Sequence, residues 1–537
     1  MLRHLISRQH IVMELRTVII LTILCTASNA DNYLVVMPMP PAPGSHTVVV
    51  ASAAIALLEN KHNVTLLVAD TYEGDVRKMM PKEAIYVVES YHTSRISPDE
   101  MTETLANITG HALAGNHLKV FKLISDAWMT NRGVCEDVFS DQELMKRLSA
   151  QKFDLVFAHF VCSVLVAQYL DVRFVSIFVS IPPSSVLRFH GHPVNPALSP
   201  ELSTGFSDRM TFLQRVKNSL ISALQWTVGR MLYNSFDSIK QKYNIKPEVS
   251  TSRSLSEAEI LFVCNHFVFD FPRAYQPNLV PIGGLTASNP RPLSDDLEDF
   301  MQSSGDAGVI IFSMGSYINA METEMADMFA QAFAKLPQKV IWKSAGQPPS
   351  FIPPNVKMSK WLPQNDILGH PKTRAMIYHC GLNGVFEAIH HAVPLICIPV
   401  LGDQWDNAKR LEVKGVGLQL ELFTLTSDKL IETVETIVTD KSYQTNMSRI
   451  SAIFHDEPLP APQRVVYWME KVVRHGGMSH LRTSAFDLNS IQYNLLDVIA
   501  FIALIAIIVI SLAIYISILL CRCLCGCCKA SKKQKEA

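Results

Sequence analysis

The sequence has little charge and no excess of either sign. Asp, Glu, Lys and Arg make up only 18% of the 537 residues, against about 25% in ordinary soluble domains. The 48 basic and 49 acidic residues leave a net charge of −1, which argues against nucleic acid as a partner, because such proteins carry a basic excess or a basic face. Hydrophobic residues make up 48%, which excludes disorder as the main state and leaves apolar residues for a membrane segment.

Cysteine is sparse in the middle of the chain. That part holds only Cys135, Cys162, Cys264, Cys380 and Cys397. This number excludes a disulfide scaffold, and at most two bridges can form. A second group crowds into the last residues: Cys521, Cys523, Cys525, Cys527 and Cys528. No histidine accompanies this group to complete a zinc site, and its place beside a hydrophobic run suggests palmitoylation.

The N-terminus has the order of a secretory signal peptide. Arg3, Arg8 and Arg16 precede a short apolar run over 18–25, and small residues follow it. The run is too short to span a bilayer. We therefore predict a signal peptide over 1–30, the alternative being a buried first strand or helix.

One long uncharged run, Val498 to Leu520, lies near the C-terminus. Its length in a helix is about 34 Å, enough for a hydrocarbon core of about 30 Å. Basic residues follow it, so the tail 521–537 is predicted to be cytosolic and the body lumenal. The lysines at 533 and 535 resemble a dilysine retrieval signal of endoplasmic-reticulum membrane proteins, although simple stop-transfer charge is the alternative.

Between these ends the chain alternates twice between strand-like and helical patterns, which predicts an α/β fold with two parallel sheets. The expected strands are 33–37, 63–68, 153–157, 174–179, 309–312, 339–342, 375–378 and 395–398. The expected helices are 47–59, 321–335, 383–391 and 404–413. The domain boundaries that follow are 31–271, a connection rich in Pro, Gly and Asp at 272–298, a second domain at 299–456, and a helical segment at 457–497 that packs on the body.

The segment 361–404 carries most of the chemical information. His379 ends an expected strand and leads through a glycine-containing turn into a helix, whose N-terminus would present N–H groups to an anion. Asn383 and Glu387 share one face of that helix and could contact a sugar or ribose. Trp361 could stack on a base. Taken singly, each has a structural alternative: a core tryptophan, a buried histidine or, for Asp403, a helix N-cap.

Taken together, these residues resemble the signature of the UDP-dependent glycosyltransferases. The pattern His379-x-Gly381-x-Asn383-Gly384 resembles the animal branch, which includes UDP-glucuronosyltransferases and ceramide galactosyltransferases. Cys380 stands where animal members usually have glycine and plant members have cysteine. The segments 208–218, 312–316 and 466–482 also resemble family segments, so the resemblance covers nearly the whole chain.

The resemblance implies a GT-B fold, in which two Rossmann-like domains face each other across a cleft, here with a C-terminal transmembrane helix. It implies a UDP-sugar donor, inversion at the anomeric carbon, and no metal or other cofactor. The residues expected to bind the UDP-sugar are Ser316, Trp361, Gln364, His379, Asn383, Gly384, Glu387, Asp403 and Gln404.

His46, in the loop after the first strand, matches the family's catalytic histidine. A histidine is the natural base for an acceptor hydroxyl, because its pKa lies near neutrality. The family usually places an Asp after a Phe-Asp-Val-type strand to support this base. Here that strand leads into His159. Another residue supplies the carboxylate, or His159 has an altered role, or catalysis is weakened.

We therefore expect a transferase that moves a hexosyl or glucuronosyl group to a hydroxyl of a small lipophilic acceptor. The alternatives are a catalytically weakened UDP-sugar-binding or partner protein, and a sugar-nucleotide epimerase on the same fold. The expected location is the endoplasmic-reticulum membrane. Glycosylation is expected among the sequons at Asn63, Asn107 and Asn446, and a homo-oligomer is left open.

Overall fold

The computed structural model describes residues 30–40, 44–113, 117–315, 321, 323–344 and 346–533. They form two units: the body, which ends at Leu481, and a C-terminal unit that begins at Arg482. The expected signal peptide lies almost entirely outside the described residues, as do Lys535 and the last residues of the tail.

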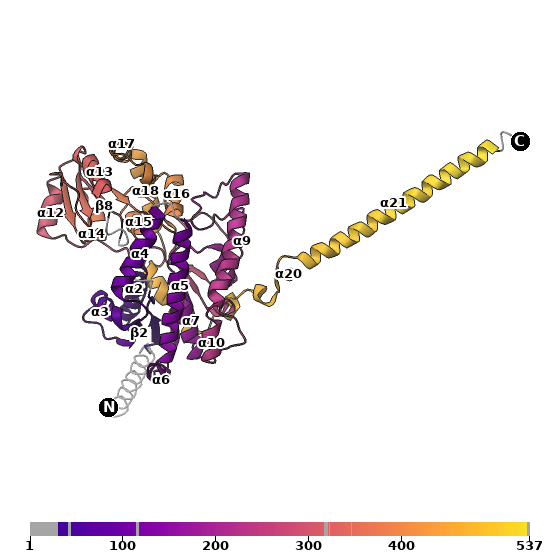
Figure 1. The fold of residues 1–537 in the computed structure, drawn as a ribbon, viewed down its shortest axis with the longest axis horizontal. Helices are drawn as coiled ribbons and strands as arrows, with labels where there is room; N and C mark the ends of the chain where they lie inside the picture. Colours follow the sequence, from indigo (N-terminus) through magenta and orange to yellow (C-terminus); the bar gives the residue numbers. More distant parts are fainter. Residues whose placement is uncertain are drawn as a thin grey trace, which may run out of the picture. The chain divides into compact units, whose positions relative to one another are not determined.

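The first domain of the body is built on a parallel sheet of seven strands (Figure 1). Its strand order is β3-β2-β1-β4-β5-β6-β7. The strands are β1 Asn32–Val36, β2 Asn63–Ala69, β3 Val87–Tyr91, β4 Leu155–His159, β5 Phe174–Phe178, β6 Leu261–Val263 and β7 Leu279–Pro281. The helices are α2 Ser45–Glu59, α3 Asp70–Met79, α4 Pro98–Leu113, α5 His117–Ser140, α6 Gln142–Ala150, α7 Phe160–Tyr169, α8 Ser184–Phe189, α9 Phe212–Asn234, α10 Asp237–Lys242 and α11 Thr251–Ser254.

The second domain has a parallel sheet of six strands in the order β10-β9-β8-β11-β12-β13. These are β8 Val309–Ser313, β9 Lys339–Lys343, β10 Val356–Ser359, β11 Thr373–Tyr378, β12 Leu395–Cys397 and β13 Gly417–Gln419. Its helices are α12 Asp295–Gln302, α13 Thr323–Ala334, α14 Gln364–Leu368, α15 Leu382–His390, α16 Gln404–Val413, α17 Ser427–Thr439 and α18 Lys441–His455.

Both sheets are buried on two faces, as parallel sheets require. In β1, Tyr33 and Val35 pack into one hydrophobic cluster, and Leu34 and Val36 pack into another on the opposite face. Strand β8 divides its residues between clusters in the same way. This pattern explains why the central strands appear in the sequence as continuous apolar runs.

The expected connection 272–298 contains two elements that the sequence did not reveal. Strand β7 pairs with β6 and completes the first sheet, and α12 begins at Asp295. Two apolar residues and a proline, Leu279 to Pro281, show no strand pattern, and the strand forms because β6 supplies a parallel edge. The link without regular structure is therefore shorter, about 282–294.

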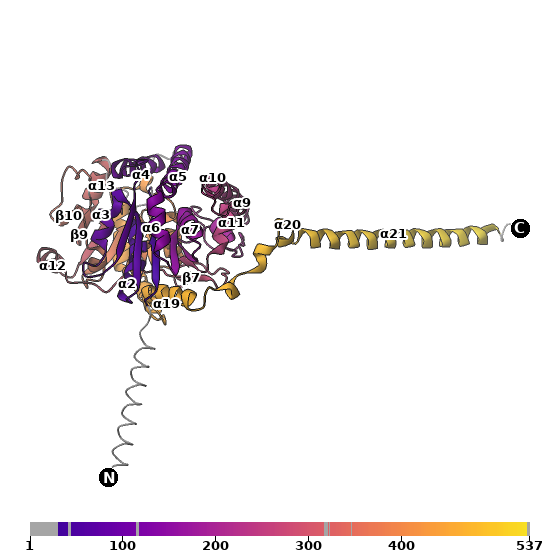
Figure 2. The same ribbon diagram turned by 90° about the horizontal axis from the view of Figure 1, so that it is seen from below.

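Helix α19 (Ala461–Arg474) returns from the second domain and packs on α2 and β4 of the first (Figure 2). Val465, Val466, Met469 and Val472 form its buried face. At its polar edge, the Glu470 carboxylate lies 3.1 Å from His62 Nε2. The first part of the segment after the second domain thus packs back on the first domain.

In the C-terminal unit, α20 (Ser490–Tyr493) precedes the long helix α21 (Leu496–Lys533). Residues Leu496–Cys523 are long and apolar enough to cross a membrane, and no part of this stretch is buried by the protein. The predicted span 498–520 lies inside it.

Candidate active site

His46 lies in the first turn of α2, directly after the loop that leaves β1. Its Nδ1 atom is 3.1 Å from Nε2 of His159, which ends β4 and is only 3% exposed. The two rings meet edge to face. Because β1 and β4 are neighbouring parallel strands, their carboxyl ends bring together two histidines that are 113 positions apart.

A largely apolar pocket opens beside this pair. Its lining includes Phe160, Phe178, Val186 and Tyr233, together with both histidines. A mostly apolar pocket with a few polar side chains is typical of a binding site for an apolar small molecule. No group of three or more His, Cys, Asp or Glu side chains suited to a metal ion occurs among the residues that the structure describes.

His379 follows β11 and is buried where the second domain faces the first. A Cβ atom at Gly315 or Gly381 would lie about 2.5 Å or less from the His379 ring, and one at Gly384 would meet the Tyr378 ring. These glycines therefore make room for the protein's own rings, a different reason from the close ligand approach suggested by the sequence. Burial lowers the pKa of His379 to about 3, so its ring is neutral.

Glu387 lies in the middle of α15, and its carboxylate accepts a hydrogen bond of 2.6 Å from the Gln364 amide. Burial raises the pKa of Glu387 to about 7, although Gln364 and Lys343 act in the opposite direction. Lys343 ends β9 and supplies positive charge beside Glu387 and His379. The sequence analysis missed Lys343, although its place at the carboxyl end of a parallel strand was a usable signal.

Three of the expected donor-site residues contact the first domain or their own loop. Asn383 donates a long hydrogen bond of 3.4 Å to the carbonyl of Ser45, next to His46. The Asp403 carboxylate accepts a hydrogen bond of 2.8 Å from Ser180 across the domain boundary, and burial raises its pKa. The Gln404 side-chain oxygen accepts from two backbone N–H groups of its own loop, so only its NH₂ group is left for a sugar.

Two expected residues remain. Trp361 is 68% exposed and is not the core residue that the structural alternative required. Ser316 lies outside the described residues.

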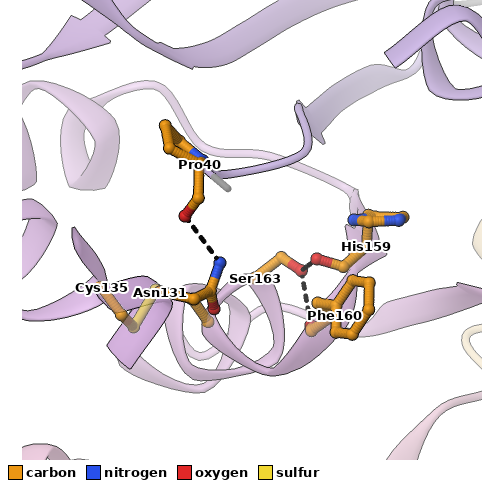
Figure 3. Close-up of a disulfide and its surroundings, with 7 residues drawn as sticks. Pro40, Asn131, Cys135, His159, Phe160 and Ser163 are labelled. Atoms are coloured by element: carbon orange, nitrogen blue, oxygen red, sulfur yellow. Dashed lines mark hydrogen bonds between the residues drawn. A yellow bond between two sulfur atoms is a disulfide. The ribbon is translucent and has the colours of Figure 1, made fainter. Parts of the chain in front are cut away.

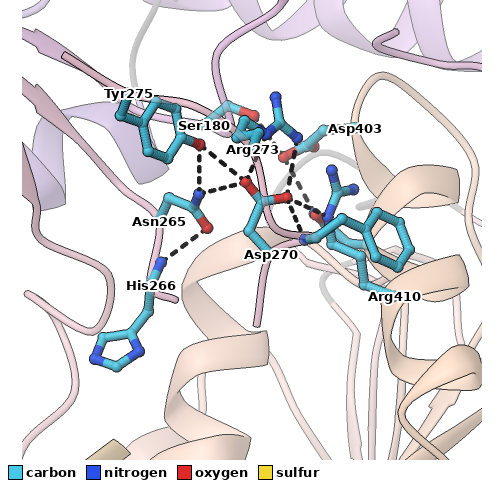
Figure 4. A network of polar contacts seen from close by, with 10 residues as sticks. Ser180, Asn265, His266, Asp270, Arg273, Tyr275, Asp403 and Arg410 are labelled. Atoms are coloured by element: carbon cyan, nitrogen blue, oxygen red, sulfur yellow. Dashed lines mark hydrogen bonds and ion pairs between the residues drawn. The ribbon is translucent and has the colours of Figure 1, made fainter. Parts of the chain in front are cut away.

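A buried ionic network joins the two domains beneath the site (Figure 4). Asp270 of the first domain lies 3.0 Å from both Arg273 and Arg410, the latter on α16. Asn265 and Tyr275 also donate hydrogen bonds to Asp270. Burial alone would raise the pKa of Asp270, but the two arginines lower it to about 2. No local pattern predicted this network, because Asp270 and Arg410 lie 140 positions apart in the sequence.

A further link between the domains runs through Asp406, which the sequence analysis also missed. It accepts hydrogen bonds from the backbone N–H groups of Ser203 and Gly205. Polar groups of both domains therefore meet beside the start of α16.

Both bridges that the cysteine count allowed are formed. Cys380 pairs with Cys397, which ties the turn after His379 to β12. Cys135 pairs with Cys162, which ties α5 to α7. Cys264 is a free, buried thiol.

Comparison with known proteins decides the family. The family model "UDP-glucoronosyl and UDP-glucosyl transferase" matches residues 33–536. The chain belongs to this family of UDP-dependent glycosyltransferases. UDP-glucuronosyltransferase 2A1 of Mus musculus is 34% identical over 86% of this chain and 89% of its own length. UDP-glucuronosyltransferase 1A1 of Homo sapiens is 34% identical over 91% of each chain.

Solved structures confirm the fold predicted for this glycosyltransferase. A UDP-glucosyltransferase from Polygonum tinctorium, solved in a complex with 3,4-dichloroaniline, superposes with a TM-score of 0.56. It is 16% identical and covers 84% of this chain and all of its own. With two parallel Rossmann-like sheets and a single apolar C-terminal helix, the chain has the GT-B architecture.

Proposed function

We propose that this glycosyltransferase moves a hexosyl or glucuronosyl group from its UDP-sugar to the hydroxyl of a small lipophilic acceptor, with inversion at the anomeric carbon. The observation that carries the proposal is the place of His46. It lines an apolar pocket of the first domain, and its neighbour Ser45 accepts a hydrogen bond from Asn383, at the start of α15 in the second domain. An acceptor in the pocket and a donor at α15 would meet at this histidine.

The proposed reaction is a direct displacement. The acceptor oxygen bonds to the anomeric carbon, its proton passes to Nε2 of His46, and the bond from the carbon to the phosphate oxygen breaks. The electron pair of that bond leaves with UDP. The N-terminus of α15 and the neutral His379 face the charge that develops on the phosphate. We expect no metal or other cofactor, so activity should survive chelation by EDTA.

A UDP-release assay tests this proposal. The detergent-solubilised protein is given UDP-glucose, UDP-galactose or UDP-glucuronate with phenols, steroids and ceramides. We expect turnover with at least one pair, and loss of about 10²–10⁴-fold in His46→Ala, the usual contribution of a general base. UDP-sugar binding without turnover on any acceptor would instead support the second candidate, a binding or partner protein, which the replacement of the family Asp by His159 favours.

We also propose that the body is lumenal in the endoplasmic reticulum, with the tail in the cytosol. Two disulfides in the body favour an oxidising compartment. The sequon at Asn63 begins β2 and is exposed, so a strand position does not prevent glycan attachment there. Protease protection of the body in sealed microsomes, and a mass decrease on glycosidase treatment, test these two points. Crosslinking of the solubilised protein tests whether it forms a homo-oligomer.

A further inference from the structure

Among the residues that the structure describes, His46 contacts a second histidine and no carboxylate. His46 and His159 contact each other through Nδ1 and Nε2, and the second nitrogen of His159 is buried without a partner. Burial is the only cause that shifts the pKa of His46, which falls to about 4. Burial and the neighbouring His46 both lower the pKa of His159. Neither imidazole is stabilised in its charged form by a carboxylate.

The other titratable groups that line the pocket are also uncharged. His190 comes from the end of α8 and Tyr233 from α9. Burial lowers the pKa of His190 to about 4 and raises that of Tyr233 well above its usual value. Pro41, Ala42 and Pro43, which precede α2, contain no acidic residue either. A proton taken up by His46 would therefore create a buried cation without a counter-ion.

This arrangement differs from a His–Asp pair in two physical ways. A carboxylate only accepts hydrogen bonds, so it fixes the proton on His46 Nδ1 and leaves Nε2 free to act as the base. His159 Nε2 can donate or accept, so it also permits the tautomer in which His46 Nε2 carries the proton and cannot act. A carboxylate also stabilises the imidazolium that forms during the reaction, whereas a neutral histidine supplies no charge.

We propose, resting on the transferase function above, that His159 restricts this enzyme to acceptors whose hydroxyl is itself acidic, phenols in preference to aliphatic alcohols. A phenol loses its proton at a pKa of about 10, as tyrosine does. An aliphatic alcohol resembles water, with a pKa of about 15.7. The phenol oxygen develops negative charge more readily than an alcohol oxygen, so its transfer demands less of the base, and the proton still passes to His46. His159 acts through His46 and is a positioning residue.

His159 is held in place by a built support. Phe160, the next residue, has a left-handed backbone conformation with φ of 63°, which is rare for a large side chain. The Ser163 hydroxyl contacts the carbonyls of His159 and Phe160, and the disulfide of Cys162 fixes the same turn of α7 to α5 (Figure 3). Strained residues persist where the surrounding structure fixes them, and they cluster at functional sites. The backbone at this position is therefore held by contacts from the same helix and by a covalent link to α5.

The test compares acceptors of similar size and graded acidity: 4-nitrophenol, phenol and cyclohexanol, with the best UDP-sugar of the donor screen. For the natural enzyme we expect kcat/KM for phenol to exceed that for cyclohexanol by about 10³-fold or more, within the range of a lost general base. Equal values for the two acceptors would overturn the proposal and leave the transferase function intact. No turnover with any of the three, and none in the wider screen, would instead count against the transferase function.

Two variants separate charge from orientation. His159→Asp places a carboxylate beside His46. We expect this variant to reduce the ratio of kcat/KM for phenol to kcat/KM for cyclohexanol at least tenfold, and to change the pH profile of kcat. His159→Asn is the matched control, because its carbonyl can orient His46 but carries no charge. It should keep the phenol preference. If both variants leave the kcat/KM ratio and the pH profile unchanged, His159 does not cause the preference for acidic acceptors. The natural enzyme's dependence of kcat/KM on acceptor pKa decides the question even if a variant does not fold.

Discussion

We predict that Glu387, in the proposed donor site, makes UDP-sugar binding depend on pH near neutrality. Its carboxylate lies in α15 beside Gln364, and burial raises its pKa to about 7. If the ionised carboxylate accepts hydrogen bonds from the ribose or sugar hydroxyls, donor affinity should fall as Glu387 takes up a proton. For one group with a pKa of about 7, the fraction ionised changes about tenfold between pH 8 and pH 6. The dissociation constant of the UDP-sugar should rise by the same factor.

The assay is isothermal titration calorimetry with a UDP-sugar, whose pyrophosphate diester does not titrate in this range. His379 does not contribute, because its pKa is about 3. Glu387→Gln should bind weakly at both pH values and show no such change. The exposed Glu412→Gln on α16 is the control, and its affinity should change with pH as in the natural protein. If Glu387→Gln and the natural protein lose affinity equally as the pH falls, Glu387 is not the group whose titration controls donor binding.

The raised pKa of Glu387 also predicts how the stability of the ligand-free protein changes with pH, in the direction opposite to donor affinity. The pKa of Glu387 is higher in the folded protein than its usual 4.5, so the native state binds more protons than the unfolded state between about pH 4.5 and 7. Stability is therefore retained below that window and lost as pH rises through it, by up to about 3 kcal/mol. Glu387→Gln removes this cost and should raise the unfolding temperature of the ligand-free protein at pH 8, while weakening donor binding.

Three further predictions concern the ionic network, the two disulfides and Trp361. Asp270→Asn should lower the free energy of unfolding by about 3–5 kcal/mol, because it leaves buried arginines unpaired, and this loss should appear as a lower melting temperature. Adding Arg410→Met to the same chain should restore part of that free energy. Cys397→Ser and Cys162→Ser should each cost about 3 kcal/mol, since their bridges close loops of 17 and 27 residues, but only Cys397→Ser should weaken UDP-sugar binding. Trp361→Ala should leave the melting temperature nearly unchanged, because the side chain is exposed, and should weaken UDP binding by about tenfold or more if it stacks on the base. Unchanged UDP affinity in Trp361→Ala or Cys397→Ser, or an unchanged melting temperature in Asp270→Asn, would contradict the corresponding argument.

Local pattern alone was enough for much of the fold. Apolar β-rich runs predicted the central strands, because a parallel strand buried on both faces must be apolar along its whole length. The helix 404–413 was predicted with the bounds of α16, and the apolar run 498–520 lies within α21. Strand β7 was missed, because three residues carry too little periodicity and the strand depends on its neighbour β6.

The candidate donor residues were all named from the sequence except Lys343, since most of them fall within 361–404 and form one contiguous signature. The reasons for its glycines could not be predicted, because the His379 and Tyr378 rings that they accommodate are placed by the turn itself. Lys343, Ser180 and Asp406 reach the cleft from separate elements, and only the packing of the two domains brings them there.

The sequence by itself determined the family, the alternation of strands and helices, the long apolar run near the C-terminus, and the presence of a histidine where an aspartate is usual. The tertiary structure decided which residues meet: His46 with His159, Asp270 with Arg410, and four of the five body cysteines in two pairs. The physical reason is the separation along the chain over which each kind of interaction acts. Propensity and periodicity act over a few residues, whereas each of these contacts depends on strand order and domain packing across tens to hundreds of positions.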